Sequence, residues 1–197
     1  MHLLERLSIL GSGPRIETAR LYLRAPKLAD WEQWAGLRSD SRRFLVPWEP
    51  VWARDSLSRN AFKMRLRRYS RDVKEDMGQA FFLFDRETDA LIGGITLSNI
   101  RRGVAQTGTL GYWVGERYAR NGYMFEALSG LLPVLFSAFG LRRVEAACLP
   151  ENIPSSKLLE KVGFTKEGLA REYLCINGVW HDHSLYAILK SDPLRPR

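Results

Sequence analysis

The sequence has few of the features that mark secreted, disulfide-rich or membrane proteins. Only two of its 197 residues are cysteines, Cys148 and Cys175, and each lies in an apolar, strand-like stretch. This favours buried free thiols in a reducing compartment and gives no reason to expect a disulfide framework. No apolar run approaches the length of a membrane span, and the first residues lack the charge order of a signal peptide. We therefore expect a cytoplasmic protein.

Histidine is also scarce, with three residues in the chain. Two of them, His181 and His183, share one face of an expected strand, while Asp182 points to the other face. Such a pair makes a poor metal site, so we expect no metal. Internal repeats and low-complexity tracts are absent from the sequence as well.

The bulk composition fits one globular domain, because 45% of the residues are hydrophobic and 26% are charged. We assign residues 19–190 to this domain, 1–18 to an N-terminal extension and 191–197 to a C-terminal tail. The leucines among residues 3–10 have helical spacing, which predicts a short helix in the extension.

The net charge of +8, in which arginine dominates, favours polyanionic partners such as a phosphorylated cofactor, RNA or an acidic surface. Basic residues are dense in the helix expected between residues 55 and 74. Its apolar residues fall on one face, so we interpret it as an amphipathic helix with a solvated basic face, with nucleic-acid binding as the alternative.

The order of expected elements indicates a mixed α/β fold. Helices are expected at 27–40, 55–74, from Gly122 to about Phe139, and within 150–164; residues 44–52 read as a loop anchored by tryptophans. Strands are expected at 19–26, 79–100 (a hairpin), 107–118, 141–149 and 165–189, the last a hairpin around Asn177-Gly178. The apolar run "VEAACL" is typical of a central strand buried on both faces.

Three segments carry a family resemblance: "GYWVGERYARNGYMFEAL", "ENIPSSKLLEKVGFTKEG" and "REYLCINGVWHDH". Together with the element order, they resemble the GNAT superfamily of acetyl-CoA-dependent N-acetyltransferases, and most closely its ribosomal-protein-alanine (RimJ-like) branch. The likeness spans about residues 20 to 189. It implies a central mixed, mostly antiparallel sheet of six to seven strands, flanked by about four helices, with acetyl-CoA as co-substrate.

In this family the coenzyme A pyrophosphate binds the N-terminus of a helix, where backbone N–H groups lack helical partners. The resemblance places that turn at Arg120, Asn121, Gly122, Tyr123 and Met124. Only Gly122 matches the usual pattern outright: Ala119 stands where Arg or Gln is usual, and Met124 where a small residue is usual. The donors are backbone groups, so binding can survive these changes, and Arg120 can supply charge. The alternative is an ordinary strand-to-helix turn.

The resemblance also implies a pantetheine site on Tyr112, Trp113 and Val114, in a strand that splays away from "VEAACL". A backbone N–H near Val114 would stabilise the oxyanion, and Asn152 would contact the pantetheine. An ordinary paired strand is the alternative. Many members use a tyrosine to protonate the thiolate, and here that position is Leu159. Ser155 is then the candidate acid, unless it only caps its helix; the adjacent Ser156 stays open.

The general base would be a carboxylate, with Glu145, Glu167 and Glu172 as candidates and Glu172 the first of them. We expect an N-acetyltransferase in which a protein N-terminal amine, for example on a ribosomal protein, attacks the thioester directly. The alternatives are a small-molecule amine as acceptor, or a non-catalytic ribosome- or RNA-docking protein with a decayed site.

The shape of the acceptor site would distinguish the two acceptor classes. An open groove would favour a peptide, and a closed aromatic pocket would favour a small molecule. A basic protein that binds basic tails would need a local acidic patch, for which Glu49 with Glu172 is the candidate.

Overall fold

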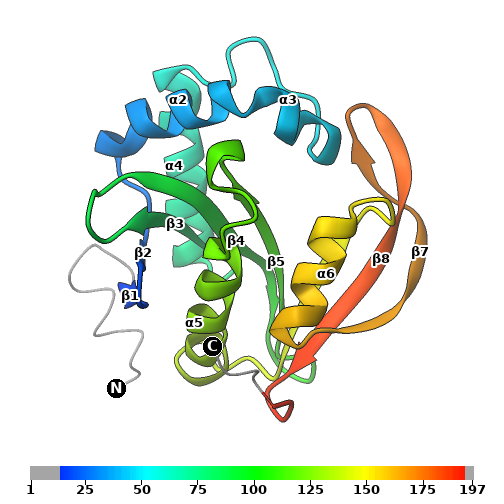
Figure 1. Cartoon of the computed structure of the whole chain (residues 1–197). Helices are drawn as coiled ribbons and strands as arrows, with labels where there is room; N and C mark the ends of the chain where they lie inside the picture. Colours follow the sequence, from blue (N-terminus) through cyan, green and yellow to red (C-terminus); the bar gives the residue numbers. More distant parts are fainter. Residues whose placement is uncertain (1–13, 194–197) are drawn as a thin grey trace.

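The computed structural model describes residues 14–193, which form one sheet with helices on both faces (Figure 1). Its strands are β1 (Ile16–Glu17), β2 (Leu21–Arg24), β3 (Gln79–Asp85), β4 (Leu91–Arg101), β5 (Thr107–Val114), β6 (Arg143–Cys148), β7 (Thr165–Ile176) and β8 (Val179–Leu189). Its α-helices are α2 (Trp31–Asp40), α3 (Arg42–Leu45), α4 (Arg59–Lys74), α5 (Tyr123–Ser137) and α6 (Ile153–Val162). The helix predicted near residues 3–10 lies outside the described residues. Within them, no helix is long and apolar enough to cross a bilayer.

The predicted fold class is confirmed, with differences in detail. The strand order is β1-β2-β3-β4-β5-β6-β8-β7, and only β5 and β6 run parallel. Residues 14–193 contain eight strands instead of the predicted six to seven. The additional strand is the two-residue β1, which lies in the segment predicted as an extension and pairs with β2. The predicted loop 44–52 begins as helix, since Ser41 accepts hydrogen bonds from the N–H groups of Phe44 and Leu45 and so starts α3.

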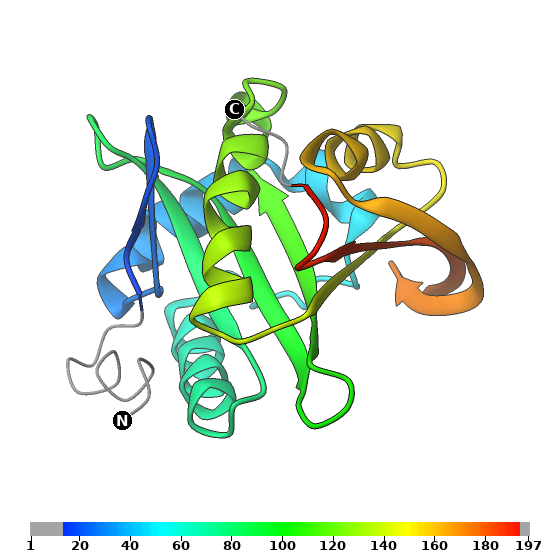
Figure 2. The same cartoon turned by 90° about the horizontal axis from the view of Figure 1, so that it is seen from below.

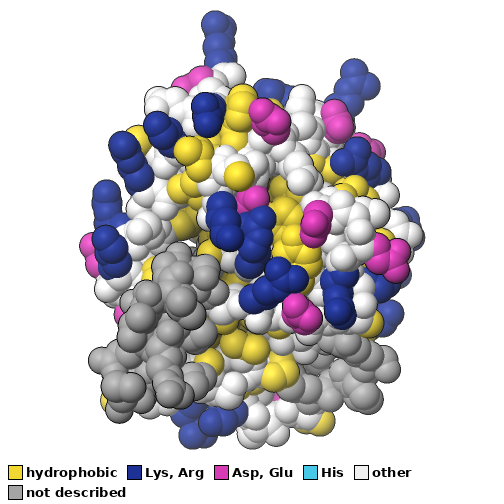
Figure 3. Space-filling view, turned by 90° about the vertical axis from the view of Figure 1, so that its left-hand side faces the viewer, with side chains coloured by type: hydrophobic (Ala, Val, Ile, Leu, Met, Phe, Trp, Pro, Cys, Tyr) yellow, Lys and Arg dark blue, Asp and Glu magenta, His cyan; other side chains and the backbone are white. Residues whose placement is uncertain are grey.

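The edge of the sheet near β2 is covered by arginine side chains that lie on aromatic rings. The Arg15 guanidinium lies 4.0 Å from the Tyr22 ring centre, and that of Arg24 lies 4.1 Å from the Phe84 ring centre. Figure 3 shows this side of the molecule, with Lys and Arg interleaved with hydrophobic side chains. The edge strand itself is β1, where the ion pair of Glu17 with the adjacent Arg15 places charge that opposes pairing with another sheet.

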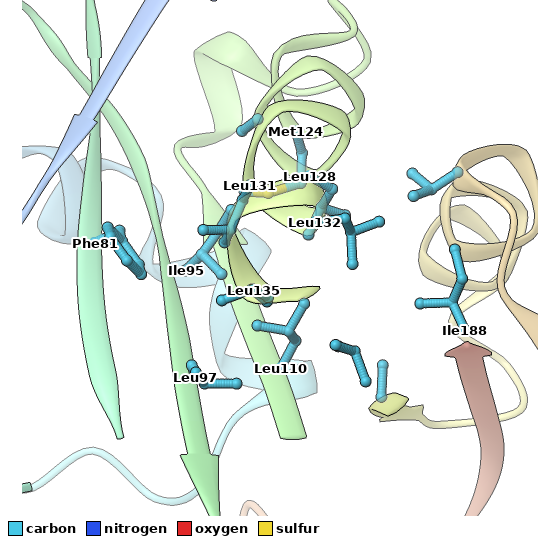
Figure 4. Close-up of a cluster of buried hydrophobic side chains, with 14 of the residues drawn as sticks. Phe81, Ile95, Leu97, Leu110, Met124, Leu128, Leu131, Leu132, Leu135 and Ile188 are labelled. Carbon is cyan, nitrogen blue, oxygen red and sulfur yellow. The ribbon is translucent and has the colours of Figure 1, made fainter. Parts of the chain in front are cut away.

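The sheet separates two hydrophobic clusters, because side chains alternate between its faces. In β3, Phe81 and Leu83 face the larger cluster under α5, while Phe82 and Phe84 face the cluster under α2 and α4. Figure 2 shows α5 lying across one face of the sheet, and Figure 4 shows its leucines meeting β4, β5 and β8. Pro133 lies inside α5 without ending it.

β6 is central, as predicted, but it is not buried on both faces. Val144, Ala146 and Cys148 are buried, whereas the residues between them are partly exposed. The reason is that α2 and α4 pack on β4 and β3 and leave this part of the sheet uncovered. The apolar "VEAACL" therefore belongs to a strand with one buried face.

β5 and β6 separate toward their C-terminal ends. Their parallel pairing runs from Thr107↔Arg143 to Leu110↔Ala146 and stops there. Beyond it, β5 pairs with β4 alone up to Val114, and β6 pairs with β8 alone up to Cys148. The splay expected from the resemblance is therefore present, and it leaves an open edge on each strand.

The β7–β8 hairpin curves across the molecule so that its turn meets the segment after α3 (Figure 1). Asn177 and Gly178 have φ values of 47° and 85°, which is the turn that an Asn-Gly pair favours. The Asn177 N–H donates to the Glu49 carbonyl oxygen at 3.0 Å. This hydrogen bond joins the hairpin turn to the loop that bears Trp52.

Candidate active site

The turn before α5 has the backbone shape of an anion site. Gly122 is the N-cap with φ +80° and Arg120 has φ +64°, so two left-handed residues bring the chain into the helix. The first helical N–H groups, from Tyr123 to Phe125, have no hydrogen-bond partner among residues 14–193. Met124 replaces a small residue here, but its side chain is 6% exposed and belongs to the core (Figure 4). The larger side chain therefore does not occupy the turn.

Arg20 lies beside this turn and was missed from the sequence. Its Nη1 donates to the Asn121 carbonyl oxygen at 3.1 Å, and its guanidinium lies 4.4 Å from the Tyr123 ring centre. Its Nη2 is 3.5 Å from the place that a Cβ on Gly122 would occupy. Arg20 thus puts a cation where Ala119 supplies none, whereas Arg120 makes no side-chain hydrogen bond or ion pair within residues 14–193.

Glu126, on the first turn of α5, holds Arg20 in place. Its carboxylate accepts from Thr18 Oγ1 at 2.6 Å, and from the Arg20 backbone N–H and Nε at 2.7 Å each. Burial raises the pKa of this carboxyl, but these hydrogen bonds outweigh burial and lower the pKa below its usual value. The one sequence feature that could have indicated this pairing is that Glu126 is a carboxylate in an otherwise apolar helix, because a buried charge requires a partner.

The open edge of β5 offers a hydrogen-bond donor to the gap, the space between β5 and β6 beyond the last pair, Leu110↔Ala146. Gly115 N–H donates to the Ile92 carbonyl oxygen on β4 at 2.9 Å, with Val114 paired to Gly93. Backbone N–H groups alternate between the two edges of a strand, so the Val114 N–H points away from β4, toward the missing β6 partner.

The start of α6 brings Asn152 and Ser155 to Tyr112. Asn152 is the helix cap, since its Oδ1 accepts from the Ser155 N–H at 3.2 Å. The cap-only role for Ser155 is therefore wrong, because Asn152 fills it. The Ser155 hydroxyl instead lies 2.8 Å from the Tyr112 hydroxyl. Burial raises the pKa of Tyr112 well above its usual range, despite an opposing effect of the Ser155 hydrogen bond, so the phenol stays protonated.

Two of the three candidate bases, Glu145 and Glu167, share one partner, and the third, Glu172, lies apart from them. Arg143 holds both Glu145, at 2.9 Å, and Glu167, at 2.8 Å. The hydrogen bond from Arg143 is the main cause that lowers the pKa of Glu167. Both carboxylates are thereby occupied in an ion-pair network. Glu172 is exposed on a β7 bulge with φ +46°, and does not line the pocket described next.

A pocket of about 540 Å³ lies on the face of the sheet covered by α2 and α4. It reaches β5 at Gly111, Tyr112 and Trp113, the stretch without a β6 partner. Its aromatic lining includes Trp34, Trp52, Tyr69, Phe82 and Trp113, and its charged lining consists of Arg38, Glu49, Arg65 and Arg68. This volume and aromatic character are typical of a small-ligand or side-chain site.

Two features shape the pocket wall: the ion pair between Arg38 and Glu49, and the close contact of the Trp113 indole with Gly94. Arg38, 8% exposed, donates to both oxygens of Glu49, and Trp52 Nε1 donates to Glu49 at 2.8 Å. The acidic patch expected from Glu49 with Glu172 does not form, because Arg38 neutralises Glu49. Gly94 lets the Trp113 indole approach β4 closely, since a Cβ there would be 2.7 Å from Trp113 Nε1.

Both cysteines are free thiols. Cys148 is buried, with its Sγ 3.4 Å from the Ser156 hydroxyl, whereas Cys175 is only partly buried. Neither thiol is among the residues that line the pocket.

Comparison with known proteins gives matches along most of the chain. A family model described as an acetyltransferase (GNAT) domain matches residues 20–165. A Bacillus subtilis protein named "Probable N-acetyltransferase YjcK" is 36% identical over 172 residues, covering 87% of this chain and 95% of that protein. The Escherichia coli ribosomal protein uS5-alanine N-acetyltransferase is 34% identical over 178 residues, covering 90% and 92% of the two chains.

Two solved structures share this fold at comparable identity. The ribosomal-protein-S5-alanine acetyltransferase of Vibrio fischeri has a TM-score of 0.83 at 32% identity, covering 93% of this chain and all of that one. Mycobacterium smegmatis RimJ, solved with a CoA-disulfide, has a TM-score of 0.81 at 30% identity, covering 91% and 87%.

Proposed function

Because this chain belongs to the GNAT family of acetyltransferases, we propose that it transfers the acetyl group of acetyl-CoA to the N-terminal amine of a protein. The observation that carries the proposal is the gap between β5 and β6, which has an anion-binding turn on one side and an aromatic pocket on the other. Similarity to enzymes named for ribosomal-protein alanine makes an N-terminal alanine of a ribosomal protein the first acceptor to test.

The cofactor would enter from the α5–α6 side of the gap. Its pyrophosphate would bind the N–H groups from Tyr123 to Phe125, with Arg20 adding a cation beside them. The pantetheine would then lie along Tyr112 and Val114, with Asn152 beside it. These residues fit the group because the turn has left-handed backbone, unpaired N–H groups and an adjacent guanidinium.

The acceptor amine would approach from the pocket and attack the thioester carbonyl carbon. As the C–N bond forms, the carbonyl oxygen gains negative charge, which the Val114 N–H is placed to stabilise. The C–S bond then breaks and the sulfur leaves as a thiolate. The amine loses its proton to a water; Glu172, which lies outside the pocket, remains the predicted base and would act through that water.

Ser155 would return a proton to the departing thiolate. A thiol of this kind has a pKa of roughly 8.5, so a weak acid suffices. Tyr112 orients the Ser155 hydroxyl from 2.8 Å, and it remains a donor at neutral pH because its own pKa is raised.

The direct test is the release of free thiol from acetyl-CoA when a peptide with a free N-terminal alanine is supplied. Turnover must depend on the free amine, so the same peptide with a blocked N-terminus is the control. Absence of turnover with every alanine- or serine-started peptide would refute the protein-acceptor version.

A second acceptor class is favoured by one observation. The hydrogen bond between Asn177 N–H and the Glu49 carbonyl bridges the hairpin and the Trp52 loop at the edge of the pocket. A bridged, aromatic pocket suits a small-molecule amine. A screen of small amines beside the peptides, with the same thiol readout, distinguishes the two classes.

A further inference from the structure

The lining of the aromatic pocket carries a net positive charge. Three arginines line it, Arg38, Arg65 and Arg68, and Glu49 is the one carboxylate among its described lining residues. Since Arg38 and Glu49 bind each other, this pair contributes no net charge. Two guanidinium groups remain on α4, facing a site whose other lining is neutral.

Arg65 and Arg68 are held by aromatic rings instead of carboxylates. The Arg65 guanidinium lies 5.3 Å from the Trp34 ring centre, and its Nη1 is 3.4 Å from the Tyr69 hydroxyl. The Arg68 guanidinium lies 5.5 Å from the Tyr69 ring centre. Neither has an acidic partner within 4.0 Å anywhere in the described part of the chain.

These contacts place the Arg65 guanidinium between Trp34 and Tyr69, whereas Arg68 is an exposed side chain beside the Tyr69 ring, and both arginines keep their capacity for hydrogen bonds to a carboxylate unused. A guanidinium binds a carboxylate in a bidentate manner, and the bond is stronger than one between neutral groups. The arginines share one pocket with the unpaired end of β5, where the acetyl group would be presented. An acceptor that reaches this end with its amine can therefore reach α4 with another part.

We propose that this pocket selects an acceptor with a carboxylate near its reactive amine, namely a protein N-terminus with an acidic residue among the first few positions. The inference rests on the proposed function and names its substrate class. The carboxylate would bind Arg65 and Arg68 and offset the repulsion between these arginines and an incoming ammonium group. The same positive lining favours the neutral, nucleophilic form of the amine once it is bound.

The test uses three peptides that start with alanine and differ only at residues two and three, which are both Glu, both Gln or both Lys. We expect kcat/KM to fall in that order, by roughly 10-fold or more at each step, as expected for a lost charge-assisted hydrogen bond. Arg65→Gln and Arg68→Gln should remove the preference for Glu over Gln. Arg67→Gln is the matched control, since Arg67 lies on the same helix, is exposed and does not line the pocket.

A binding measurement separates this inference from the proposed function. The N-acetylated Glu and Gln peptides are titrated into the enzyme with coenzyme A present. Tighter binding of the Glu peptide, lost in Arg68→Gln but kept in Arg67→Gln, supports the carboxylate site even if no peptide turns over. In that case an amino acid is compared with its amide as acceptor, and preference for the free carboxylate assigns the site to a small molecule.

Equal binding and equal kcat/KM for the Glu and Gln peptides would overturn the inference, as would an equal effect of Arg67→Gln and Arg68→Gln. Unchanged acetyl-CoA affinity in each variant shows that the fold is intact.

Discussion

At the scale of single residues, Gly122 tests the proposal that the turn before α5 binds phosphate. Its φ of +80° is a region that β-branched residues avoid. Gly122→Val should weaken acetyl-CoA binding roughly 10- to 100-fold, because the strain of about 1–3 kcal/mol would redirect the N–H groups. Arg120→Ala should have a much smaller effect, since that side chain makes no hydrogen bond or ion pair within the described residues 14–193. Calorimetric titration with acetyl-CoA measures both.

Gly163 provides a strain control for this prediction. It also has a left-handed φ, of +117°, but it ends α6 away from the turn. Gly163→Val should therefore reduce stability without a comparable loss of acetyl-CoA affinity. If Arg120→Ala weakens binding more than Gly122→Val does, side-chain charge and not the backbone holds the cofactor.

Ser155 and Ser156 are adjacent hydroxyls with different partners, so they test the proton donor. Ser155→Ala should lower kcat by about 10²-fold, the lower end for loss of a general acid, with KM for acetyl-CoA little changed. Tyr112→Phe should have a smaller effect in the same direction, because it removes only the group that orients Ser155. Steady-state kinetics at saturating substrates gives the values.

Ser156→Ala serves as the control, because its hydroxyl lies near Cys148 instead. A loss of kcat in Ser156→Ala equal to that in Ser155→Ala would reject the assignment of Ser155.

At the scale of elements, the sequence predicted what depends on local pattern. The Asn177-Gly178 hairpin, the helix ended by Gly163 and the splay at "GYWV" follow from short-range signals or from a family motif. The two-residue β1 was missed because it pairs without a periodic pattern of its own. The loop 44–52 was misread at its start because prolines and tryptophans there masked a single turn of helix.

The parts of the candidate site that were missed depend on residues far apart in sequence. Arg20 and Glu126 are separated by 106 positions, and Tyr112 and Ser155 by 43. No periodicity connects such positions, so their contacts become visible only when the sheet brings β2 beside α5 and β5 beside α6. The cationic pocket was missed for the same reason, since its lining combines Arg65 and Arg68 of α4 with residues 111–113 of β5.

The contact between β2 and α5 is itself testable through pH. The folded-state pKa of Glu126 lies below its unfolded value, so its stabilisation is present above the unfolded pKa of about 4.3 and is lost as pH falls through the folded pKa. Glu126→Gln should cost about 1–2 kcal/mol at pH 7, toward the low end because Arg20 is half-exposed.

Urea unfolding of both proteins at pH 7 and in steps below pH 4 measures this difference. The difference in the free energy of unfolding between wild type and Glu126→Gln should become smaller as the pH falls. A difference that stays constant with pH would mean that the carboxylate charge is not what holds Arg20.

At the scale of the whole molecule, the gap divides the sheet into two parts. β1–β5 with α2, α4 and α5 lie on one side, and β6–β8 with α6 lie on the other, joined in the sheet by only four paired positions from Leu110↔Ala146 downward. The two parts also share the hydrophobic cluster under α5, in which Leu132 and Ile188 lie, and two hydrogen bonds, Asn177 N–H to the Glu49 carbonyl and Tyr112 to Ser155. A ligand that contacts both α5 and α6 would therefore strengthen the connection between the parts.

Acetyl-CoA should accordingly stabilise the entire fold and not only one helix. At a concentration 100 times its Kd, a ligand that binds only the native state adds about 2.7 kcal/mol. For a chain of this size, that corresponds to a rise in Tm of about 5–10 °C. Thermal unfolding with and without acetyl-CoA measures the shift, and Gly122→Val at the same ligand concentration should give a smaller one. A wild-type Tm that does not move at millimolar acetyl-CoA would exclude cofactor binding across the gap, because no native-state ligand at saturation can leave the unfolding equilibrium unchanged.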